Sequence, residues 1–151
     1  MLQILEYIEE RDRMNLINFL RALPREDLYK RFFTPKIDAE KYVSRIGGRD
    51  GVILVAYYNN ELIGLCEAYR DDGEWETAII IDRRFRRRGI GREMLKEAAK
   101  LILKRGGRII YGIIDRSNRS AIEFGKALGA DIISLDSRTV KVVFKLEDII
   151  E

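Results

Sequence analysis

The sequence predicts a single α/β domain over residues 1–151, with a mixed, mostly antiparallel sheet that is flanked by helices and contains one parallel strand pair. Two observations predict this class. Apolar runs of strand length alternate with turn signals between residues 51 and 81, and a helical apolar stripe followed by another strand comes directly after them. A strand–helix–strand order implies parallel strands with a crossover helix. The length and the 46% apolar content suffice for one core.

The first fifty residues favour one strand and three helices. Residues 2–8 are β-prone, and the apolar residues of 14–23 recur at steps of three and four, as on one face of a helix. Pro24 ends this helix, because proline cannot continue the backbone hydrogen bonding. Residues 26–33 and 39–46 predict two further short helices.

The next segment predicts an antiparallel meander of three strands. Residues 52–58 and 62–69 are joined by Asn59-Asn60, and Asn tolerates the positive φ that a tight hairpin turn requires. Asp71-Asp72-Gly73 is a second turn signal, which leads into a third strand over residues 74–81.

A long helix is predicted over residues 89–105, followed by a short apolar strand over 109–114. Two glycines close the helix before that strand begins. The apolar stripe of the helix consists of Met94, Leu95, Ala98, Leu101 and Ile102.

The C-terminal part predicts one more helix and a hairpin. Ser120 and Glu123 have the Ser-x-x-Glu spacing of a capping box, so a helix should begin near them and end at Gly129. Residues 132–135 and 140–144 then close the chain as a β-hairpin.

The composition excludes several kinds of chemistry. The chain has no His and one Cys, so it cannot form a Cys/His zinc site, a Ser-His-Asp or Cys-His catalytic pair, or an internal disulfide. We expect no metal. Any catalysis must use carboxylates, hydroxyls, backbone amides, or Arg and Lys.

No segment predicts a membrane span or an export signal. The longest apolar run, residues 52–58, is far shorter than the roughly 20 residues of a spanning helix, and the N-terminus lacks a signal-peptide pattern. We therefore expect a soluble, cytoplasmic protein. The 35% of charged residues and the single Gln suggest a thermophilic source, a hypothesis that a melting temperature below about 60 °C would count against.

Residues 83–92, which we call the arginine turn, stand between the third meander strand and the long helix. Six of these residues are Arg, and Gly89 and Gly91 allow a sharp turn and close approach of a ligand. Amides at a helix N-terminus and Arg side chains both favour phosphate. The pattern is compatible with a phosphate-bearing cofactor, a nucleic-acid patch or a solvated charge cluster. A dinucleotide-binding turn fits poorly, because Met94 occupies the position of its third Gly.

Two motifs resemble the GNAT superfamily of acetyl-CoA-dependent N-acetyltransferases. The family's Gln/Arg-x-x-Gly-x-Gly/Ala motif matches residues 86–91, between an antiparallel meander and a helix. The second motif, an Asn followed by a helix that ends in Leu-Gly, matches Asn118, Ala121, Phe124, Leu128 and Gly129. The resemblance covers nearly the whole chain and implies the GNAT fold, in which the parallel strand pair splays apart.

A finer similarity is to the Pat-type protein lysine acetyltransferases. Residues 28–33 look like their Tyr-x-Arg-Phe-Phe element, and residues 76–81 resemble their Glu-x-Ala-Val-Val-Val strand. This similarity implies acetylation of lysine on a protein substrate. We also expect a monomer or homodimer with no direct nucleic-acid partner and no membrane partner.

The resemblance also implies where acetyl-CoA binds. The pyrophosphate should sit on the backbone amides of the arginine turn, and the pantetheine arm should pair like a strand with residues 79–81. The cofactor-binding residues implied in this way are Ile79, Ile80, Ile81, Arg86, Arg87, Arg88, Gly89, Ile90, Gly91, Arg92, Asn118 and Phe124.

Direct transfer of acetyl to an amine needs a base, because a lysine amine with a reference pKa of about 10.4 is protonated at neutral pH. Without His the base should be a carboxylate, and Glu76 matches the Glu of the Pat-type strand. Glu67 is the reserve candidate. Asp71 and Asp72 are expected only to solubilise a hairpin end, and for Glu74 both roles stay open.

The residue at the position of the family's usual general acid differs in this chain. Many GNAT enzymes carry a Tyr where this chain has Gly125, and a Gly inside a helix hints at close approach by a ligand or another backbone. Tyr111 could substitute as the acid, although an aromatic residue in an apolar strand usually packs in the core. Asn118 could cap its helix or bind the cofactor.

Two other functions stay open from the sequence. One is GNAT acetylation of a small-molecule amine, and the other is a non-catalytic module that binds acyl-CoA or nucleic acid through the arginine turn. Outside residues 83–92 the chain has 22 basic and 25 acidic residues, so the cationic turn is set in a mildly acidic body that could receive a basic substrate.

Overall fold

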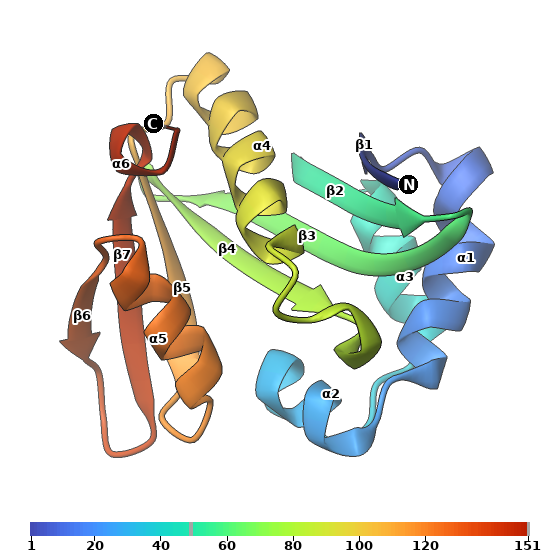
Figure 1. Ribbon diagram of the computed structural model, residues 1–151, viewed down its shortest axis with the longest axis horizontal. Coiled ribbons are helices and arrows are strands. Elements are labelled where there is room, and N and C mark those ends of the chain that lie inside the picture. The colour runs from blue at the N-terminus through green and yellow to red at the C-terminus, as the bar shows by residue number, and fades with distance from the viewer. Residues whose placement is uncertain (49, 151) are drawn as a thin grey trace.

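The computed structural model describes residues 1–48 and 50–150 and consists of a seven-stranded sheet with helices on both faces (Figure 1). The strand order is β1-β2-β3-β4-β5-β7-β6. The elements in chain order are β1 (Leu2–Glu6), α1 (Glu9–Ala22), α2 (Arg25–Phe32), α3 (Ala39–Gly48), β2 (Gly51–Tyr58), β3 (Glu61–Asp71), β4 (Glu74–Ile81), the 3₁₀ turn η1 (Arg83–Phe85), α4 (Ile90–Lys104), β5 (Ile109–Asp115), α5 (Arg119–Ala127), β6 (Asp131–Ser134), β7 (Thr139–Lys145) and α6 (Leu146–Ile150).

The sheet confirms the predicted meander and the predicted parallel pair. Strands β1 to β4 pair antiparallel in sequence order, and β5, β7 and β6 pair antiparallel on the other side. Only β4 and β5 are parallel, with Trp75 opposite Ile110 and Glu76 opposite Tyr111. Beyond these two pairs the strands diverge, which leaves a gap in the middle of the sheet (Figure 1).

Both predicted turns of the meander are present. Asn59 and Asn60 have φ values of 48° and 69°, and Asp72 and Gly73 have φ values of 48° and 85°. Two successive residues with positive φ are the geometry of turns that match the right-handed twist of the paired strands. The turns fix the register of β3 and β4, and so fix which side chains of β4 face each side of the sheet.

Two apolar clusters cover the two faces of the sheet. One contains α4 residues such as Met94 and Leu95, and Trp75 of β4 belongs to it. The other contains α1 residues such as Leu16 and Leu20, and Ile80 of β4 belongs to it. Within the described residues no helix is long and apolar enough to cross a membrane.

The alternation of β4 decides the direction of Glu76. Pairing with β3 is continuous from Glu74 to Ile81, so no bulge interrupts the alternation. Glu76 therefore shares the α1–α3 face with Ile80, and Trp75 points to the opposite, α4 face.

One expectation about the C-terminal part is wrong, because Ser120 does not cap its helix, and the alternative that Asn118 caps it is confirmed. The capping residue of α5 is Asn118, whose Oδ1 accepts a hydrogen bond from the Ala121 amide at 3.3 Å, so Ser120 lies inside the helix. Either residue type can cap a helix, and the chain leaves β5 early enough for Asn118 to do so. The short helix α6 was not expected, and its Leu146 and Ile149 are buried in the cluster of α4.

Gly125 is required by packing within the protein. A Cβ built at this position would lie 2.5 Å from Val142 Cγ1 of β7. The close approach suspected from the sequence is therefore to a side chain, and not to a ligand or another backbone. Because α5 packs this tightly on β7, a Tyr could not occupy position 125 without moving the helix.

Candidate active site

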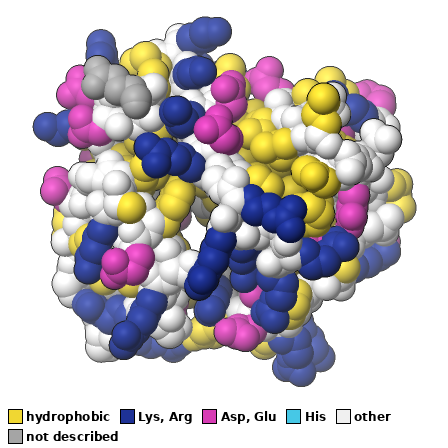
Figure 2. Space-filling view, viewed as in Figure 1, with side chains coloured by type: hydrophobic (Ala, Val, Ile, Leu, Met, Phe, Trp, Pro, Cys, Tyr) yellow, Lys and Arg dark blue, Asp and Glu magenta, His cyan; other side chains and the backbone are white. Residues whose placement is uncertain are grey.

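The gap between β4 and β5 opens into a cavity of about 580 Å³ that α2, the arginine turn and the first turns of α4 and α5 complete. Figure 2 shows this face hollowed between its two halves, with Lys and Arg side chains bordering the hollow. The structure brings all the predicted site residues except Arg88 into this lining, namely Glu76, Ile79, Ile80, Ile81, Arg86, Arg87, Gly89, Ile90, Gly91, Arg92, Asn118 and Phe124.

The arginine turn presents unpaired backbone amides to the cavity. Arg87 and Gly89 have left-handed φ values of 62° and 77°, and Gly89 is the N-cap of α4. The first backbone hydrogen bond of the helix runs from the Glu93 amide to the Gly89 carbonyl at 3.1 Å. Among the described residues, no amide from Arg87 to Arg92 donates a hydrogen bond. Free amides at the positive end of a helix form a site for an anion such as phosphate.

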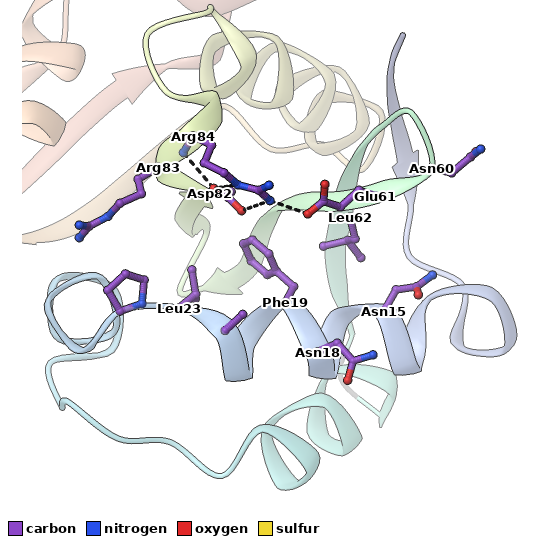
Figure 3. Close-up of a pocket in the computed structure, with 12 residues that line it drawn as sticks. Asn15, Asn18, Phe19, Leu23, Asn60, Glu61, Leu62, Asp82, Arg83 and Arg84 are labelled. Carbon is purple, nitrogen blue, oxygen red and sulfur yellow. Dashed lines mark hydrogen bonds and ion pairs between the residues drawn. The ribbon is translucent and has the colours of Figure 1, made fainter.

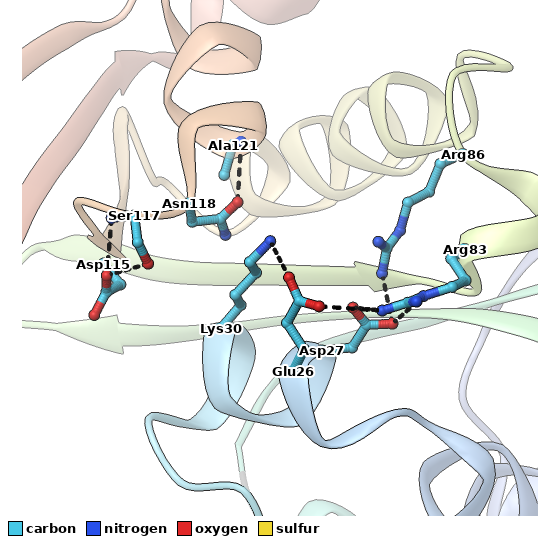
Figure 4. A network of polar contacts seen from close by, with 9 residues as sticks. All are labelled: Glu26, Asp27, Lys30, Arg83, Arg86, Asp115, Ser117, Asn118 and Ala121. Carbon is cyan, nitrogen blue, oxygen red and sulfur yellow. Dashed lines mark hydrogen bonds and ion pairs between the residues drawn. The ribbon is translucent and has the colours of Figure 1, made fainter.

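A buried carboxylate anchors the arginine turn to α2 (Figure 4). Asp27 of α2 accepts hydrogen bonds from Arg83 Nε at 3.2 Å and Arg83 Nη2 at 3.0 Å, and Arg86 Nη2 lies 3.1 Å from Asp27 Oδ2. Burial alone would raise the pKa of Asp27, but the Arg83 hydrogen bonds and the Arg86 charge outweigh it and hold the pKa below its ordinary value. Asp27 therefore stays charged and fixes two of the six arginines.

Arg88 is placed differently from the expectation. Its guanidinium stacks 5.2 Å from the ring centroid of Phe85, and it does not line the cavity. The left-handed backbone at Arg87 turns the chain so that neighbouring arginines point in different directions. A count of charges along the sequence cannot predict this separation.

The edge of β4 that faces the gap is unpaired beyond Glu76. β5 pairs with β4 only at Trp75 and Glu76, while β3 pairs with β4 along its full length. In the described part of the chain, the gap-facing backbone groups of β4 after Glu76 therefore have no strand partner. An extended polar chain of the right length can satisfy them by pairing like a strand.

Glu76 lies at the point where the two strands part. Its side chain is exposed and lines the cavity, and Tyr111 is its partner across the parallel pair. Among the described residues, Glu76 forms no hydrogen bond or ion pair with another side chain. Its carboxylate is thus not engaged by another side chain of the described residues.

Four residues around Glu76 are held in two polar contacts. Tyr111 donates its hydroxyl proton to Asp71 Oδ2 at 2.5 Å, and Lys141 Nζ donates to Glu74 Oε1 at 3.2 Å. Burial and the Asp71 hydrogen bond raise the pKa of the Tyr111 hydroxyl. Because that proton is directed at Asp71, Tyr111 is not poised in this structure to protonate a leaving group. Asp71 does more than solubilise a hairpin end.

Glu67, the reserve candidate for the base, is unsuited to that role. Its side chain is 1% exposed, and it accepts hydrogen bonds from Arg31 Nη2 and the Tyr42 hydroxyl, both at 2.5 Å, and from the Tyr69 hydroxyl at 2.7 Å. Burial, with a smaller effect of the Glu67 charge, raises the pKa of Tyr42. A carboxylate with three donors and no opening to the cavity holds α2 and α3 on the sheet.

Cys66 cannot act as a nucleophile for a covalent route. It is fully buried in the α4-side cluster, and burial raises the pKa of its thiol to about 12. The reactive thiolate is therefore essentially absent at neutral pH. Among the described residues, no cluster of acidic, Cys or His side chains could hold a metal ion.

A second cavity, of about 570 Å³, lies between α1 and the start of β3 (Figure 3). Its charged side chains are largely paired with one another. Arg84 Nη2 lies 2.5 Å from Glu61 and 2.9 Å from Asp82, and Arg83 turns away to Asp27. No unpaired carboxylate comparable to Glu76 faces this cavity among the described residues, so the gap between β4 and β5 is the candidate active site.

Sequence reasoning missed three residues that shape this site. Asp27, Arg31 and Lys141 each form an ion pair with a residue far away in the chain. Arg31 lies within the Tyr-x-Arg-Phe-Phe element, which was a signal for it. No local sequence pattern indicated a role for Asp27 or Lys141.

The fold and the site together define a protein that binds an elongated, phosphate-bearing ligand between two splayed parallel strands. The sequence profile described as "Acetyltransferase (GNAT) family" matches residues 17–130. The chain therefore belongs to the GNAT acetyltransferase family, and it is an N-acetyltransferase whose cosubstrate is acetyl-CoA. No curated protein sequence gives a significant match.

Solved structures share this fold along nearly the whole chain. The GNAT domain of S. lividans PAT matches with a TM-score of 0.86 and 23% identity, over 95% of this chain and 90% of that chain. Salmonella typhimurium yncA, a putative acetyltransferase determined with acetyl-CoA, matches with a TM-score of 0.78 and 14% identity, over 96% of this chain and 94% of that chain. The paia N-acetyltransferase of Thermoplasma acidophilum, in complex with coenzyme A, matches with a TM-score of 0.73 and 19% identity, over 96% of this chain and 99% of that chain.

Proposed function

We propose that this enzyme transfers the acetyl group of acetyl-CoA to the ε-amine of a lysine on a protein substrate, with Glu76 as general base. The observation that carries the proposal is the exposed Glu76 carboxylate at the point where β4 and β5 part, in the same cavity as the unpaired amides of the arginine turn.

The residues of the cavity fit acetyl-CoA from one end to the other. The free amides from Arg87 to Arg92, with Arg86 beside them, suit the pyrophosphate. The gap-facing edge of residues 79–81, which has no strand partner in the described structure, suits the amide-containing arm, whose groups can pair with backbone. Asn118 and Phe124 of α5 line the opposite wall. Bound acetyl-CoA supplies an acetyl group activated as a thioester.

Glu76 would then perform the proton step. An incoming lysine arrives mostly as the ammonium ion, which cannot attack a carbonyl carbon. The exposed Glu76 carboxylate accepts one proton, directly or through a water, and the neutral amine attacks. The buried Cys66 supplies no thiol nucleophile for a covalent intermediate, which agrees with direct attack.

The surroundings of Glu76 favour a basic protein segment over an enclosed small amine. Asp71 and Asp72 are exposed at the tip of the β3–β4 hairpin, and Glu74 is partly exposed beside them. This acidic rim attracts positive charge from solution. The resemblance to the Pat-type enzymes supports the same choice of substrate.

The test is to incubate the protein with acetyl-CoA and two sets of acceptors, basic lysine-containing proteins and polyamines. We expect Nε-acetyl-lysine on the proteins, found by mass spectrometry, with release of one coenzyme A thiol per acetyl group. The Glu76→Gln variant serves as the control for uncatalysed acetylation. Turnover of the polyamines alone would contradict a protein substrate.

A further inference from the structure

Lys141 of β7 lies beside the candidate active site, in contact with Tyr111, which lines the cavity, and with Glu74. It lies opposite Ile113 in the β5–β7 pair, and its side chain crosses over β5 toward β4. Its Nζ donates to Glu74 Oε1 at 3.2 Å and lies 4.4 Å from the centroid of the Tyr111 ring. We call Glu74 and Tyr111 the lysine cage.

The lysine cage has the chemistry that holds an alkylammonium ion out of bulk water. A carboxylate neutralises the charge and an aromatic face attracts it, each more strongly as water is excluded. The Lys141 side chain is 27% exposed, so the ammonium group is partly desolvated. A substrate lysine would need the same two kinds of contact.

The lysine cage adjoins the candidate base. Tyr111 is the direct partner of Glu76 across the parallel strands, and Glu74 is two residues before Glu76 on the same face. Lys141 Nζ therefore contacts two neighbours of Glu76, namely Glu74 on the same strand and Tyr111 on β5.

We propose that Lys141 is itself an acetyl acceptor, so that the enzyme modifies its own cage lysine. This inference rests on the proposed function, because it uses the same bound acetyl-CoA and the same base. It goes further in assigning a modification site within the chain.

The step balances without another reactant. One proton leaves the Lys141 ammonium for the Glu76 carboxylate and passes to solvent. Nζ forms a bond to the acetyl carbonyl carbon, and the carbon–sulfur bond breaks. A second proton from Nζ goes to the departing thiolate, so the products are Nε-acetyl-Lys141 and the coenzyme A thiol.

The modification should stop after one acetyl group per chain. The product is a neutral amide that cannot form an ion pair with Glu74 or a cation–π contact with Tyr111. Acetylation therefore releases both cage residues and leaves an uncompensated carboxylate beside Glu76, where an external ammonium can bind.

The test is intact-mass and peptide analysis of the full chain after incubation with acetyl-CoA alone. We expect one acetyl group at Lys141, formed at a rate constant that does not change when the protein is diluted tenfold. Lys141→Arg should abolish it. Lys145→Arg, on the same strand and the same face but outside the lysine cage, should leave it unchanged, and Glu76→Gln should slow it as it slows acetylation of external amines.

A second measurement needs no acetyl-CoA. In the free protein the Cε protons of Lys141 should be shifted upfield by the ring of Tyr111, and Tyr111→Leu should remove that shift in the NMR spectrum. Turnover of external amines with Lys141 unmodified, or labelling spread evenly over the lysines, overturns self-acetylation alone. Absence of both reactions overturns the proposed function with it.

Discussion

Replacing Glu76 by Gln should lower kcat about 10²- to 10⁴-fold at pH 7, the range that general base catalysis contributes. The exposed carboxylate lies at the point where the strands part, and Gln keeps its size while removing its ability to accept a proton. The difference in kcat between the variant and the unmodified sequence should shrink as pH rises toward about 10, because the acceptor amine then loses its proton to solvent without a base from the protein. Steady-state rates from pH 6 to 10 measure this.

The control for this variant is Glu97→Gln on the exposed side of α4, where the carboxylate contacts only Lys100 in the described structure. Its rates should match those of the unmodified sequence at every pH. A Glu76→Gln enzyme with the same kcat and the same pH profile would remove Glu76 from the mechanism.

Replacing Glu67 by Gln should destabilise the fold by about 3 kcal/mol, the lower end of the cost of leaving one partner of a buried ion pair alone. Glu67 is 1% exposed and its partner Arg31 only 16% exposed, so the guanidinium cannot recover its hydration. For a domain of this length the melting temperature should fall by roughly 6–12 °C. Urea unfolding and a thermal scan measure the loss.

The chain offers a matched control at the surface. Arg21 and Glu40 lie at the same 2.5 Å separation, but their side chains are 54% and 62% exposed. Glu40→Gln should therefore cost no more than about 1 kcal/mol. If Glu40→Gln and Glu67→Gln lowered the free energy of unfolding equally, burial of Arg31 would not be the reason that Glu67 is needed for stability. Replacing both Arg31 and Glu67 by apolar residues should cost less than Glu67→Gln.

The parts of the fold that follow local rules were predictable. Asn59-Asn60 and Asp72-Gly73 tolerate the positive φ of tight turns, and these turns set the meander. Period-two alternation in β4 then places Glu76 on the face opposite α4. Gly89 and Gly91 mark the turn at the start of α4, where the free amides are found. Each of these inferences needs only residues that are neighbours in the chain.

The ion pairs that position the site were not predictable in the same way. Asp27 and Arg83 are 56 residues apart, Arg31 and Glu67 are 36 apart, and Glu74 and Lys141 are 67 apart. Many acids and bases in this highly charged chain could have paired, and only the packing of α2 and β7 on the sheet selects the partners. Gly125 is another such case, because the nearness of Val142 is fixed by how α5 docks on β7.

A structure of the protein in complex with coenzyme A tests the central claim most directly. The account predicts the pyrophosphate on the amides of residues 87–92, the pantetheine arm along the gap-facing edge of residues 79–81, and the thiol beside Glu76. Coenzyme A bound instead in the cavity between α1 and the start of β3, or bound with its thiol away from Glu76, would contradict it.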